Sequence, residues 1–278
     1  MTAFKNLMEC SGPAVSVITV VFNAESLISR TIESVLDQTY SNLEYIIVDG
    51  NSNDDTSRII SLYTSHAILH HRGSDRGIYD AMNKGVLLAN GKWIIFMNAG
   101  DIFADNEVLS NIFSLPVTEN VKFLYSDFIM SGKLKDDYKL YTADYKRGII
   151  LHQSVIYQKE LHRSYGQYLV TPKIIISDYL FFNAIPEEMI AKTEVVISIN
   201  NDAGISQGSW CYFQKKCADY IFRRITLTAL LKSILLYRFK KIVLAIPGIG
   251  GRTGYGLNKN IKTISISEPE SQEEKPDR

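Results

Sequence analysis

The sequence predicts an α/β fold in which helices flank a mostly parallel central sheet. Short β-branched runs alternate with segments of helical periodicity, and polar residues gather directly after the runs, which is typical of parallel sheets that bind ligands at one edge. The 278 residues are 46% hydrophobic and 22% charged, as expected for a globular protein with a sizeable core. Because 30 basic residues balance 30 acidic ones, the chain has no general attraction to nucleic acid.

Seven helices and strands are expected in chain order over residues 15–97. Apolar and β-branched runs predict strands over 15–22, 44–49, 67–70 and 92–97, and helices are expected between them over 24–38, 54–63 and 77–89. The first helix places Ile28, Ile32 and Val35 on one face, and the second follows an Asn/Ser/Asp cluster that can cap it. The third helix is closed by Asn90 and Gly91, which deliver the chain into the last strand.

Three of the expected strands end in polar loops. The first runs into Asn23, the second into the segment 49–56, and the last into Asn98-Ala99-Gly100-Asp101. Because the carboxyl ends of parallel strands share one edge, we expect these loops to line a common cleft. Carboxylates and amides there suit a nucleotide base, a ribose and a metal that bridges a pyrophosphate. A simpler alternative stays open, in which Asp49 starts a tight turn and the last loop caps a helix near Asp105.

Several segments resemble family 2 glycosyltransferases in order and spacing over about the first 110 residues. They are 15–23 (VSVITVVFN), 34–40 (SVLDQTY), 44–50 (EYIIVDG), 77–85 (GIYDAMNKG) and 98–101 (NAGD). The resemblance implies the GT-A fold, with a nucleotide-binding α/β domain and Mg²⁺ or Mn²⁺ holding the diphosphate of a sugar donor. Segment 77–85 is similar to the subgroup that builds bacterial exopolysaccharides and O-antigens.

Donor contacts are implied by the same resemblance. Thr19 and Asn23 match the first-strand contacts of the family. Asp49 matches the first acid of a paired-acid loop, whose second acid is replaced by Gly50 in this chain.

The start of the helix over 77–89 is a candidate for binding the diphosphate. Arg76 could bind a phosphate bidentately beside the positive end of the helix, or it is a solvated surface residue. The resemblance implies that Asp80 and Asn83 face the donor, whereas the spacing of Asp80 and Lys84 also fits a surface ion pair.

The metal motif of the family, often Asp-x-Asp, is reduced to the turn 98–101 in this chain. Asp101 is expected to be the charged ligand of Mg²⁺ or Mn²⁺, with Asn98 as a helper and the diphosphate and water completing an octahedral site. His152 is a further candidate for the metal or for an acceptor contact, although a lone histidine is often structural.

Inverting glycosyl transfer also needs a base, because the acceptor hydroxyl must lose its proton as it attacks. Segment 176–182 (ISDYLFF) resembles the acidic site at the start of an acceptor-side helix in the family, which makes Asp178 the expected base. The alternatives are that Asp178 only caps that helix, or that Asp202 serves as the base.

The C-terminal third has a different character. From Lys215 to Lys241 it carries eight basic residues and one acid, interleaved with apolar residues. Such a segment could lie on an anionic membrane surface, or its helices could pack on the catalytic domain. We expect a GT-A domain over 1–210, with a nucleotide-binding half (14–115) and an acceptor half (116–210), then a basic amphipathic helical appendage (211–262) and a disordered tail (263–278).

The expected activity is metal-dependent, inverting transfer of a hexose from a nucleotide-diphosphate sugar to a saccharide acceptor, lipid-linked in bacterial surface polysaccharide synthesis. The scattered Cys10, Cys211 and Cys217 and the missing secretory pattern favour a cytoplasmic location, with the inner face of the plasma membrane as a peripheral site. Two alternatives stay open: a catalytically silent saccharide-binding or scaffold protein, and a sugar nucleotidyltransferase.

Overall fold

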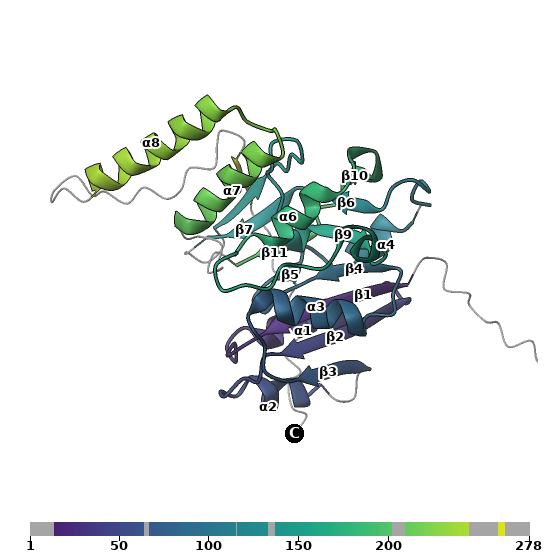
Figure 1. Ribbon diagram of the computed structural model, residues 1–278. Helices are drawn as coiled ribbons and strands as arrows, with labels where there is room; N and C mark the ends of the chain where they lie inside the picture. The colour runs from purple at the N-terminus through teal and green to yellow at the C-terminus, as the bar shows by residue number, and fades with distance from the viewer. Residues whose placement is uncertain are drawn as a thin grey trace, which may run out of the picture.

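The computed structural model describes residues 14–63, 67–114, 116–132, 137–201, 209–244 and 261–264 (Figure 1). Its centre is a seven-stranded sheet in the order β10-β6-β9-β4-β1-β2-β3. The strands are β1 (Val15–Val21), β2 (Leu43–Asp49), β3 (Ile68–Arg72), β4 (Trp93–Phe96), β6 (Phe123–Tyr125), β9 (Val155–Gln158) and β10 (Ile190–Lys192). β9 runs antiparallel to both neighbours, and the other pairings in this sheet are parallel. The mostly parallel sheet predicted from the sequence is confirmed.

Helices cover both faces of this sheet. They are α1 (Ile28–Leu36), α2 (Thr56–Ser61), α3 (Ile78–Leu88), α4 (Val108–Ile112), α5 (Leu161–Tyr165) and α6 (Ser177–Ala184), with 3₁₀ turns η1 (His152–Ser154) and η2 (Glu187–Met189). Figure 1 shows α3 in front of the sheet and α1 behind it. One core cluster joins the sheet to α1, α2 and α4, and a second joins it to α3, α5 and α6.

The apolar run of β1 is uninterrupted because both faces of this strand are buried. Val17 packs in the core on the α1 side, whereas Ile18 and Val20 pack in the core on the α3 side. Every residue of β1 is buried, as expected for a central strand covered on both faces.

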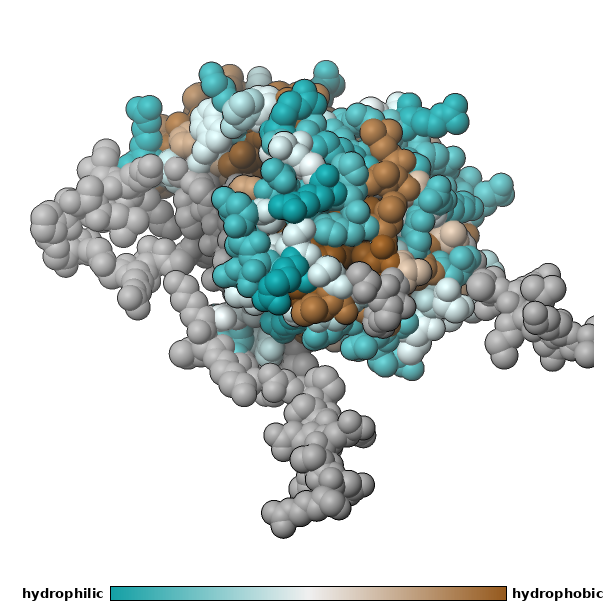
Figure 2. All heavy atoms as spheres, turned by 90° about the horizontal axis from the view of Figure 1, so that it is seen from below, coloured by the Kyte–Doolittle hydropathy of each residue, from teal (hydrophilic) through white to brown (hydrophobic). Residues whose placement is uncertain are grey.

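The edge strand β3 ends the sheet on a polar surface. It carries His70, His71 and Arg72 in succession. Figure 2, seen from below the view of Figure 1, shows the end of the molecule formed by α2 and β3 as mostly hydrophilic, with hydrophobic side chains gathered in a narrow strip. Charged and polar side chains on an edge strand discourage pairing with a further strand.

A second, five-stranded sheet has the order β12-β8-β7-β11-β5. Its strands are β5 (Ile102–Phe103), β7 (Phe128–Ser131), β8 (Tyr138–Tyr141), β11 (Ser198–Asn200) and β12 (Ile261–Ile264). Because β5 follows Asp101 directly and β11 pairs with β5, this sheet brings Asn201 next to the turn that ends β4. The expected disordered tail from 263 is wrong at its start, since residues 263 and 264 pair with β8 in β12.

Two further helices follow β11 in the chain, α7 (Ser209–Ile221) and α8 (Leu227–Leu244). α7 packs on α6, where Asp219 accepts a hydrogen bond from the Tyr179 hydroxyl at 2.5 Å. α8 contacts α7 through the ring of Tyr237, which lies 4.8 Å from the ring of Phe213. Within the described ranges, no helix is long and apolar enough to cross a membrane.

Candidate active site

The polar loops predicted from the sequence meet at the carboxyl edge of the main sheet. β1 and β2 pair in parallel up to Val21 and Asp49, and the backbone N–H of Asn23 donates to the Ser52 hydroxyl at 2.9 Å. In return, Asn23 Oδ1 accepts from the backbone N–H of Asn53 at 2.9 Å. Asn23 has a φ of 51°, a left-handed conformation that asparagine tolerates well. Its side chain therefore joins two of the three loops, and its donor contact stays a prediction.

Asp49 lies at the end of β2 and is fully buried. Its Oδ1 accepts from the backbone N–H of Ser52 at 2.7 Å, which is the turn-starting role considered above. Its Oδ2 has no hydrogen-bond partner and lies 3.8 Å from both His70 Nε2 and Arg72 Nε. A buried carboxylate oxygen without a hydrogen bond is costly. Asp49 Oδ2 is such an oxygen, and it lies near the Arg72 guanidinium and the His70 ring.

Gly50 leaves room for a different acid. A Cβ atom at Gly50 would lie 2.9 Å from Asp75 Oδ2. The Asp75 carboxylate therefore occupies the space next to Asp49 that a second acid at position 50 would need. Lys84 Nζ binds Asp75 Oδ1 and balances its charge.

Thr19 is fully buried in β1, and its hydroxyl donates to the Met97 carbonyl at 2.7 Å and lies 2.9 Å from the Tyr45 hydroxyl. Both hydrogen-bonding directions of this hydroxyl are used inside the core, and its donor contact stays a prediction. Thr19 fixes the carbonyl that immediately precedes Asn98.

The turn from Asn98 to Asp101 is anchored by α1. The Thr31 hydroxyl accepts from the backbone N–H of Gly100 at 2.9 Å and donates to the Asp101 carbonyl at 2.9 Å. Gly100 has a φ of 100°, so a side chain there would be strained.

Asp101 is buried by this arrangement, with 6% of its surface exposed. Its Oδ1 accepts from the backbone N–H of Asn201 at 2.9 Å, and its Oδ2 accepts from Gln153 Nε2 at 2.5 Å. Burial raises the pKa of the Asp101 carboxyl, which these hydrogen bonds only partly offset. Each oxygen accepts one hydrogen bond and keeps a further lone pair, so the metal contact of Asp101 stays a prediction. The alternative that it caps α4 is wrong, since α4 starts at Val108 after Glu107.

A chain of hydrogen bonds links the end of β4 to α6. Asn98 Nδ2 lies 2.8 Å from His152 Nε2, and His152 Nδ1 lies 3.2 Å from Asp178 Oδ2. The Tyr79 hydroxyl donates to Asp178 Oδ1 at 2.7 Å. β9 pairs antiparallel with β4, and that register, continued past Ile95 and Ile156, sets Asn98 beside η1 and His152.

Asp178 is the accessible carboxylate of this cluster, with 20% of its side chain exposed. Burial raises its pKa, but hydrogen bonds, first from His152 and then from the Tyr79 hydroxyl, outweigh burial and leave the pKa below its ordinary value. Burial, with the nearby Asp178 charge, raises the pKa of Tyr79, which stays a hydrogen-bond donor. α6 starts after Ile176 without a side-chain hydrogen bond to cap it, so the capping alternative for Asp178 is not supported.

The side chains at this site do not form a ready-made cluster of metal ligands. Both ring nitrogens of His152 face partners, Asn98 and Asp178, so neither nitrogen is free for the predicted metal contact. Over the part of the chain that the structure describes, no group of three His, Cys, Asp or Glu residues could hold a metal. One oxygen of the expected helper is nevertheless unused, since Asn98 Oδ1 is buried without a hydrogen-bond partner.

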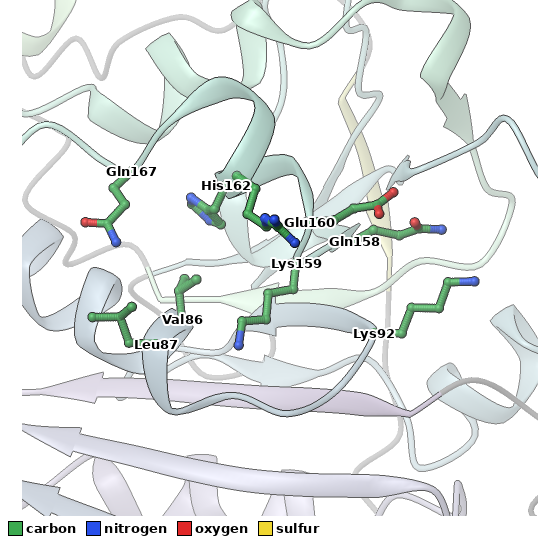
Figure 3. A pocket seen from close by; sticks show the side chains of 9 residues that line it. Val86, Leu87, Lys92, Gln158, Lys159, Glu160, His162 and Gln167 are labelled. Atoms are coloured by element: carbon green, nitrogen blue, oxygen red, sulfur yellow. The ribbon is translucent and has the colours of Figure 1, made fainter.

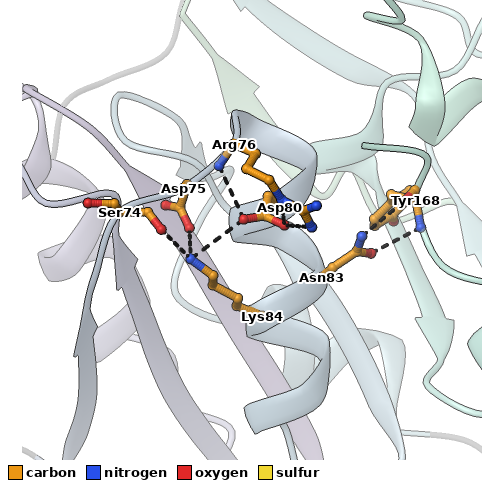
Figure 4. Close-up of polar contacts among 7 residues, drawn as sticks. All are labelled: Ser74, Asp75, Arg76, Asp80, Asn83, Lys84 and Tyr168. Carbon is orange, nitrogen blue, oxygen red and sulfur yellow. Dashed lines mark hydrogen bonds and ion pairs between the residues drawn. The ribbon is translucent and has the colours of Figure 1, made fainter. Parts of the chain in front are cut away.

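The start of α3 is a network of charges (Figure 4). Arg76 is 78% exposed, and its guanidinium donates to Asp80 Oδ1 at 2.7 Å, while its backbone N–H donates to Asp80 Oδ2 at 3.1 Å. The hydrogen bond from Arg76 lowers the pKa of Asp80. Lys84 Nζ lies 3.6 Å from Asp80 Oδ2, so the ion-pair alternative is present. Arg76 and Asp80 therefore bind each other in this structure, and their donor contacts stay predictions.

Asn83 holds the segment after α5 against α3. Its Nδ2 donates to the Tyr168 carbonyl at 2.8 Å, and its Oδ1 accepts from the Tyr168 backbone N–H at 3.0 Å (Figure 4). The donor contact of Asn83 stays a prediction.

Several site residues were missed by the sequence reasoning. Tyr79, Thr31 and Gln153 each hold a predicted site residue in place, and Asp75 fills the space beside Gly50. Tyr79 and Gln153 lie within or beside recognised motifs and could have been suspected, whereas Thr31 carries no such signal. The rival base Asp202 lies outside the described residues.

The cavity in Figure 3 is separate from this site. It measures about 380 Å³ and is lined by residues that include Lys92, Lys159 and Arg163. Lys92 precedes β4, so the cavity lies at the opposite end of that strand from Asn98.

Comparisons with known proteins identify the family of this chain. The model of the family described as glycosyl transferase family 2 matches residues 16–167. A PGL/p-HBAD biosynthesis glycosyltransferase of Mycobacterium bovis is 28% identical over 172 residues, which are 59% of this chain and 67% of the relative. The Escherichia coli UDP-Glc:alpha-D-GlcNAc-diphosphoundecaprenol beta-1,3-glucosyltransferase WfaP is 35% identical over 125 residues, 42% of this chain and 49% of the relative.

Solved structures share the fold. The S. aureus TarS 1–349 complex with UDP-GlcNAc has a TM-score of 0.60 at 15% identity and covers 75% of this chain and 65% of that one. The mannosyltransferase PcManGT of Pyrobaculum calidifontis, in complex with GDP-Man and Mn²⁺, has a TM-score of 0.54 at 17% identity, covering 74% and 61%. The chain thus spans less than two thirds of either structure. Because the family model matches more than half of its 278 residues, the chain belongs to glycosyl transferase family 2 and has the GT-A fold.

Proposed function

We propose that this chain transfers a hexose, with inversion, from a nucleotide-diphosphate sugar to a lipid-linked saccharide in bacterial surface polysaccharide synthesis. The observation that carries the proposal is Asp178, a partly exposed carboxylate with hydrogen-bond donors at both oxygens. Such a group is ionised and oriented before an acceptor arrives, as a general base must be.

The proposed reaction is one in-line displacement. The acceptor hydroxyl oxygen bonds to the anomeric carbon, the bond from that carbon to the donor diphosphate breaks, and the hydroxyl proton passes to Asp178. A single carboxylate is sufficient, in contrast to the pair used by glycosidases. Tyr79 and His152 hold the carboxylate by hydrogen bonds of 2.7 and 3.2 Å.

The donor is proposed to lie across the loops after β1 and β2 and the start of α3. Asp49 Oδ2 has no hydrogen bond and suits a nucleobase N–H, but it is fully buried, so the donor would reach it only after the loop following β2 moves. Asn23 joins the two loops beside it. Arg76 at the amino end of α3 offers a cation for the diphosphate once it exchanges its bond with Asp80. WfaP is named for UDP-Glc, which makes UDP-glucose the first donor to assay.

We also propose that Mg²⁺ or Mn²⁺ accompanies the donor, as Mn²⁺ accompanies GDP-Man in the PcManGT structure. A bound cation would neutralise charge on the leaving diphosphate. Asn98 Oδ1 is the unused side-chain oxygen that could contact it, whereas each Asp101 oxygen already accepts one hydrogen bond, from Gln153 or Asn201. No step of the mechanism above uses the cation.

The proposed division of labour assigns catalysis to residues 1–210 and membrane contact to the appendage, residues 211–262. α7 packs on α6 through Asp219 and Tyr179. α8 exposes Leu231, Leu235 and Phe239 by 51%, 68% and 66%. Lys232 and Arg238 lie among these side chains. Apolar residues among cations suit an anionic lipid surface, which would place this cytoplasmic protein beside a lipid-linked acceptor.

The proposal is tested with Asp178→Asn, which removes the base but keeps its size. Transfer from UDP-glucose to GlcNAc-diphosphoundecaprenol should fall by about 100-fold or more, whereas UDP binding should stay within about twofold. Glu119→Gln is the control, because it also removes one negative charge but at an exposed residue. Unchanged transfer by Asp178→Asn would exclude the proposed base. Donor binding without transfer by the wild type would favour a silent saccharide-binding protein.

A further inference from the structure

His152 lies between the turn 98–101 and the proposed base. We propose that His152 is a positioning residue, which holds the Asp178 carboxylate in one orientation and ties that orientation to the turn 98–101 through Asn98. The inference rests on the proposed role of Asp178. It assigns to His152 a role different from both sequence-based expectations, metal ligation and acceptor contact.

The order of donors and acceptors follows from chemistry. The Asn98 Nδ2 group can only donate, so His152 Nε2, 2.8 Å away, must accept and carries no proton. The neutral imidazole then carries its proton on Nδ1, which lies 3.2 Å from Asp178 Oδ2 and donates to it. Asn98 thus selects the tautomer that can hold Asp178.

The two ends of this chain are fixed independently. At one end, the Asn98 carbonyl accepts from the backbone N–H of Asp101 at 2.9 Å, within the turn anchored by Thr31. At the other end, the Tyr79 hydroxyl holds Asp178 Oδ1 at 2.7 Å. With donors at both oxygens, the carboxylate cannot rotate without breaking a hydrogen bond.

Neighbouring residues of η1 divide the work. His152 binds the base, and Gln153 binds Asp101 Oδ2 at 2.5 Å. Both are held at this level by the 3₁₀ turn, in which the backbone N–H of Ser154 donates to the Leu151 carbonyl at 3.0 Å. One turn therefore couples the end of β4 to the start of α6. A shift of the turn 98–101 would therefore move the Asp178 carboxylate through two hydrogen bonds, Asn98–His152 and His152–Asp178.

The kinetic test uses UDP-glucose, Mn²⁺ and GlcNAc-diphosphoundecaprenol. His152→Ala should lower kcat by about 10- to 100-fold and leave the donor KM within about twofold, because orientation of the base matters in the transition state. His152→Asn places an amide near the former Nδ1 and should restore much of the lost kcat. At saturating Mn²⁺, where loss of the proposed cation contact of Asn98 Oδ1 does not limit the rate, Asn98→Ala should lower kcat in the wild type but have little further effect in His152→Asn, where the link is already broken.

Two kinetic outcomes would overturn the inference. A raised Mn²⁺ requirement with unchanged kcat in His152→Ala would indicate a metal ligand. Equal effects of Asn98→Ala in both backgrounds would show that Asn98 does not act through His152.

A spectroscopic test needs no substrate. The chain has five histidines, and the ¹⁵N ring signals of His152 can be assigned by their loss in His152→Asn. We expect the Nδ1–H tautomer in the wild type and a shift toward the Nε2–H tautomer in Asn98→Ala. An Nε2–H tautomer in the wild type, or no change in Asn98→Ala, would refute the proposed link.

Failure of this inference differs from failure of the proposed function. If Asp178→Asn transfers normally, the base assignment itself is wrong. If Asp178→Asn loses transfer while His152→Ala and Asn98→Ala keep the wild-type kcat, only the positioning role is wrong.

Discussion

Asp101 offers the sharpest contrast between a metal ligand and a buried structural carboxylate. Asp101→Asn should be tolerated, because the new amide oxygen can still accept from the Asn201 backbone N–H. Its NH₂ group would face Gln153, whose Oε1 is buried without a hydrogen-bond partner and can accept after the Gln153 amide rotates. Since burial also raises the pKa of Asp101, removing the charge relieves a desolvation cost.

The magnitude follows from these contacts. Asp101→Asn keeps the number of hydrogen bonds, so the free energy of unfolding should change by less than about 1 kcal/mol. Asp101→Ala leaves the Asn201 N–H and the Gln153 amide without their charged acceptor, at about 1.5 to 3 kcal/mol each. The resulting loss of about 3 to 6 kcal/mol corresponds to a fall in Tm of roughly 10 °C.

The assay combines thermal unfolding with a Mn²⁺ titration of UDP binding. We expect Asp101→Asn to keep both the wild-type Tm and the wild-type Mn²⁺ dependence. A variant with unchanged Tm that no longer responds to Mn²⁺ would refute this reasoning and restore Asp101 as a metal ligand.

Three further predictions concern stability, packing and the membrane. Burial lowers the pKa of His162 from 6.5 to about 4. Between these pH values the unfolded chain binds a proton that the folded chain does not, so the free energy of unfolding should be highest above pH 6.5 and fall by about 3 kcal/mol toward pH 4, as measured by urea unfolding. Gly50→Asp should push Asp75 off Lys84 and cost about 1 to 3 kcal/mol by thermal unfolding, because the added Cβ lies 2.9 Å from Asp75 Oδ2. Replacing Leu231 and Leu235 of α8 by Ser should reduce sedimentation with anionic vesicles severalfold without lowering Tm, since both side chains are exposed.

Matched controls make these results specific. His162→Gln removes the titrating group and should flatten the pH dependence. Gly50→Ala adds the Cβ without the charge, and a cost equal to that of Gly50→Asp would show that charge is irrelevant there. Ser at Leu62 and Leu87, which are 68% and 67% exposed outside α8, should leave vesicle binding unchanged. Equal loss in both leucine pairs would argue against a specific role of α8.

The fold was largely predictable because burial on both faces leaves a local signature. The expected strands 15–22 and 44–49 match β1 and β2 to within one residue at either end. The antiparallel insertion of β9 between β4 and β6 was not predictable, because a short apolar run carries no information on its direction. The pairing of β12 with β8 joins residues more than 100 positions apart and has no local signal either.

The site was predictable in its parts but not in its connections. Asp178 and His152 were both singled out, yet their contact depends on how α6 packs over η1. Tyr79 reaches Asp178 across 99 positions of the chain. Thr19 and Asn83 matched family positions, but in the folded chain both side chains bind residues of the protein itself.

The amino-acid sequence by itself determined the fold class, the family and the polar loops that gather at one edge of the sheet, because periodicity and motif spacing are properties of neighbouring residues. Only the tertiary structure decided which carboxylates remain open. Asp101 and Asp178 are the same residue type at the end of one element and the start of another. Partners from distant segments bury Asp101, whereas Asp178 keeps 20% of its side chain exposed. Desolvation and hydrogen-bond partners depend on contacts between distant segments, so accessibility is settled only when the chain has folded.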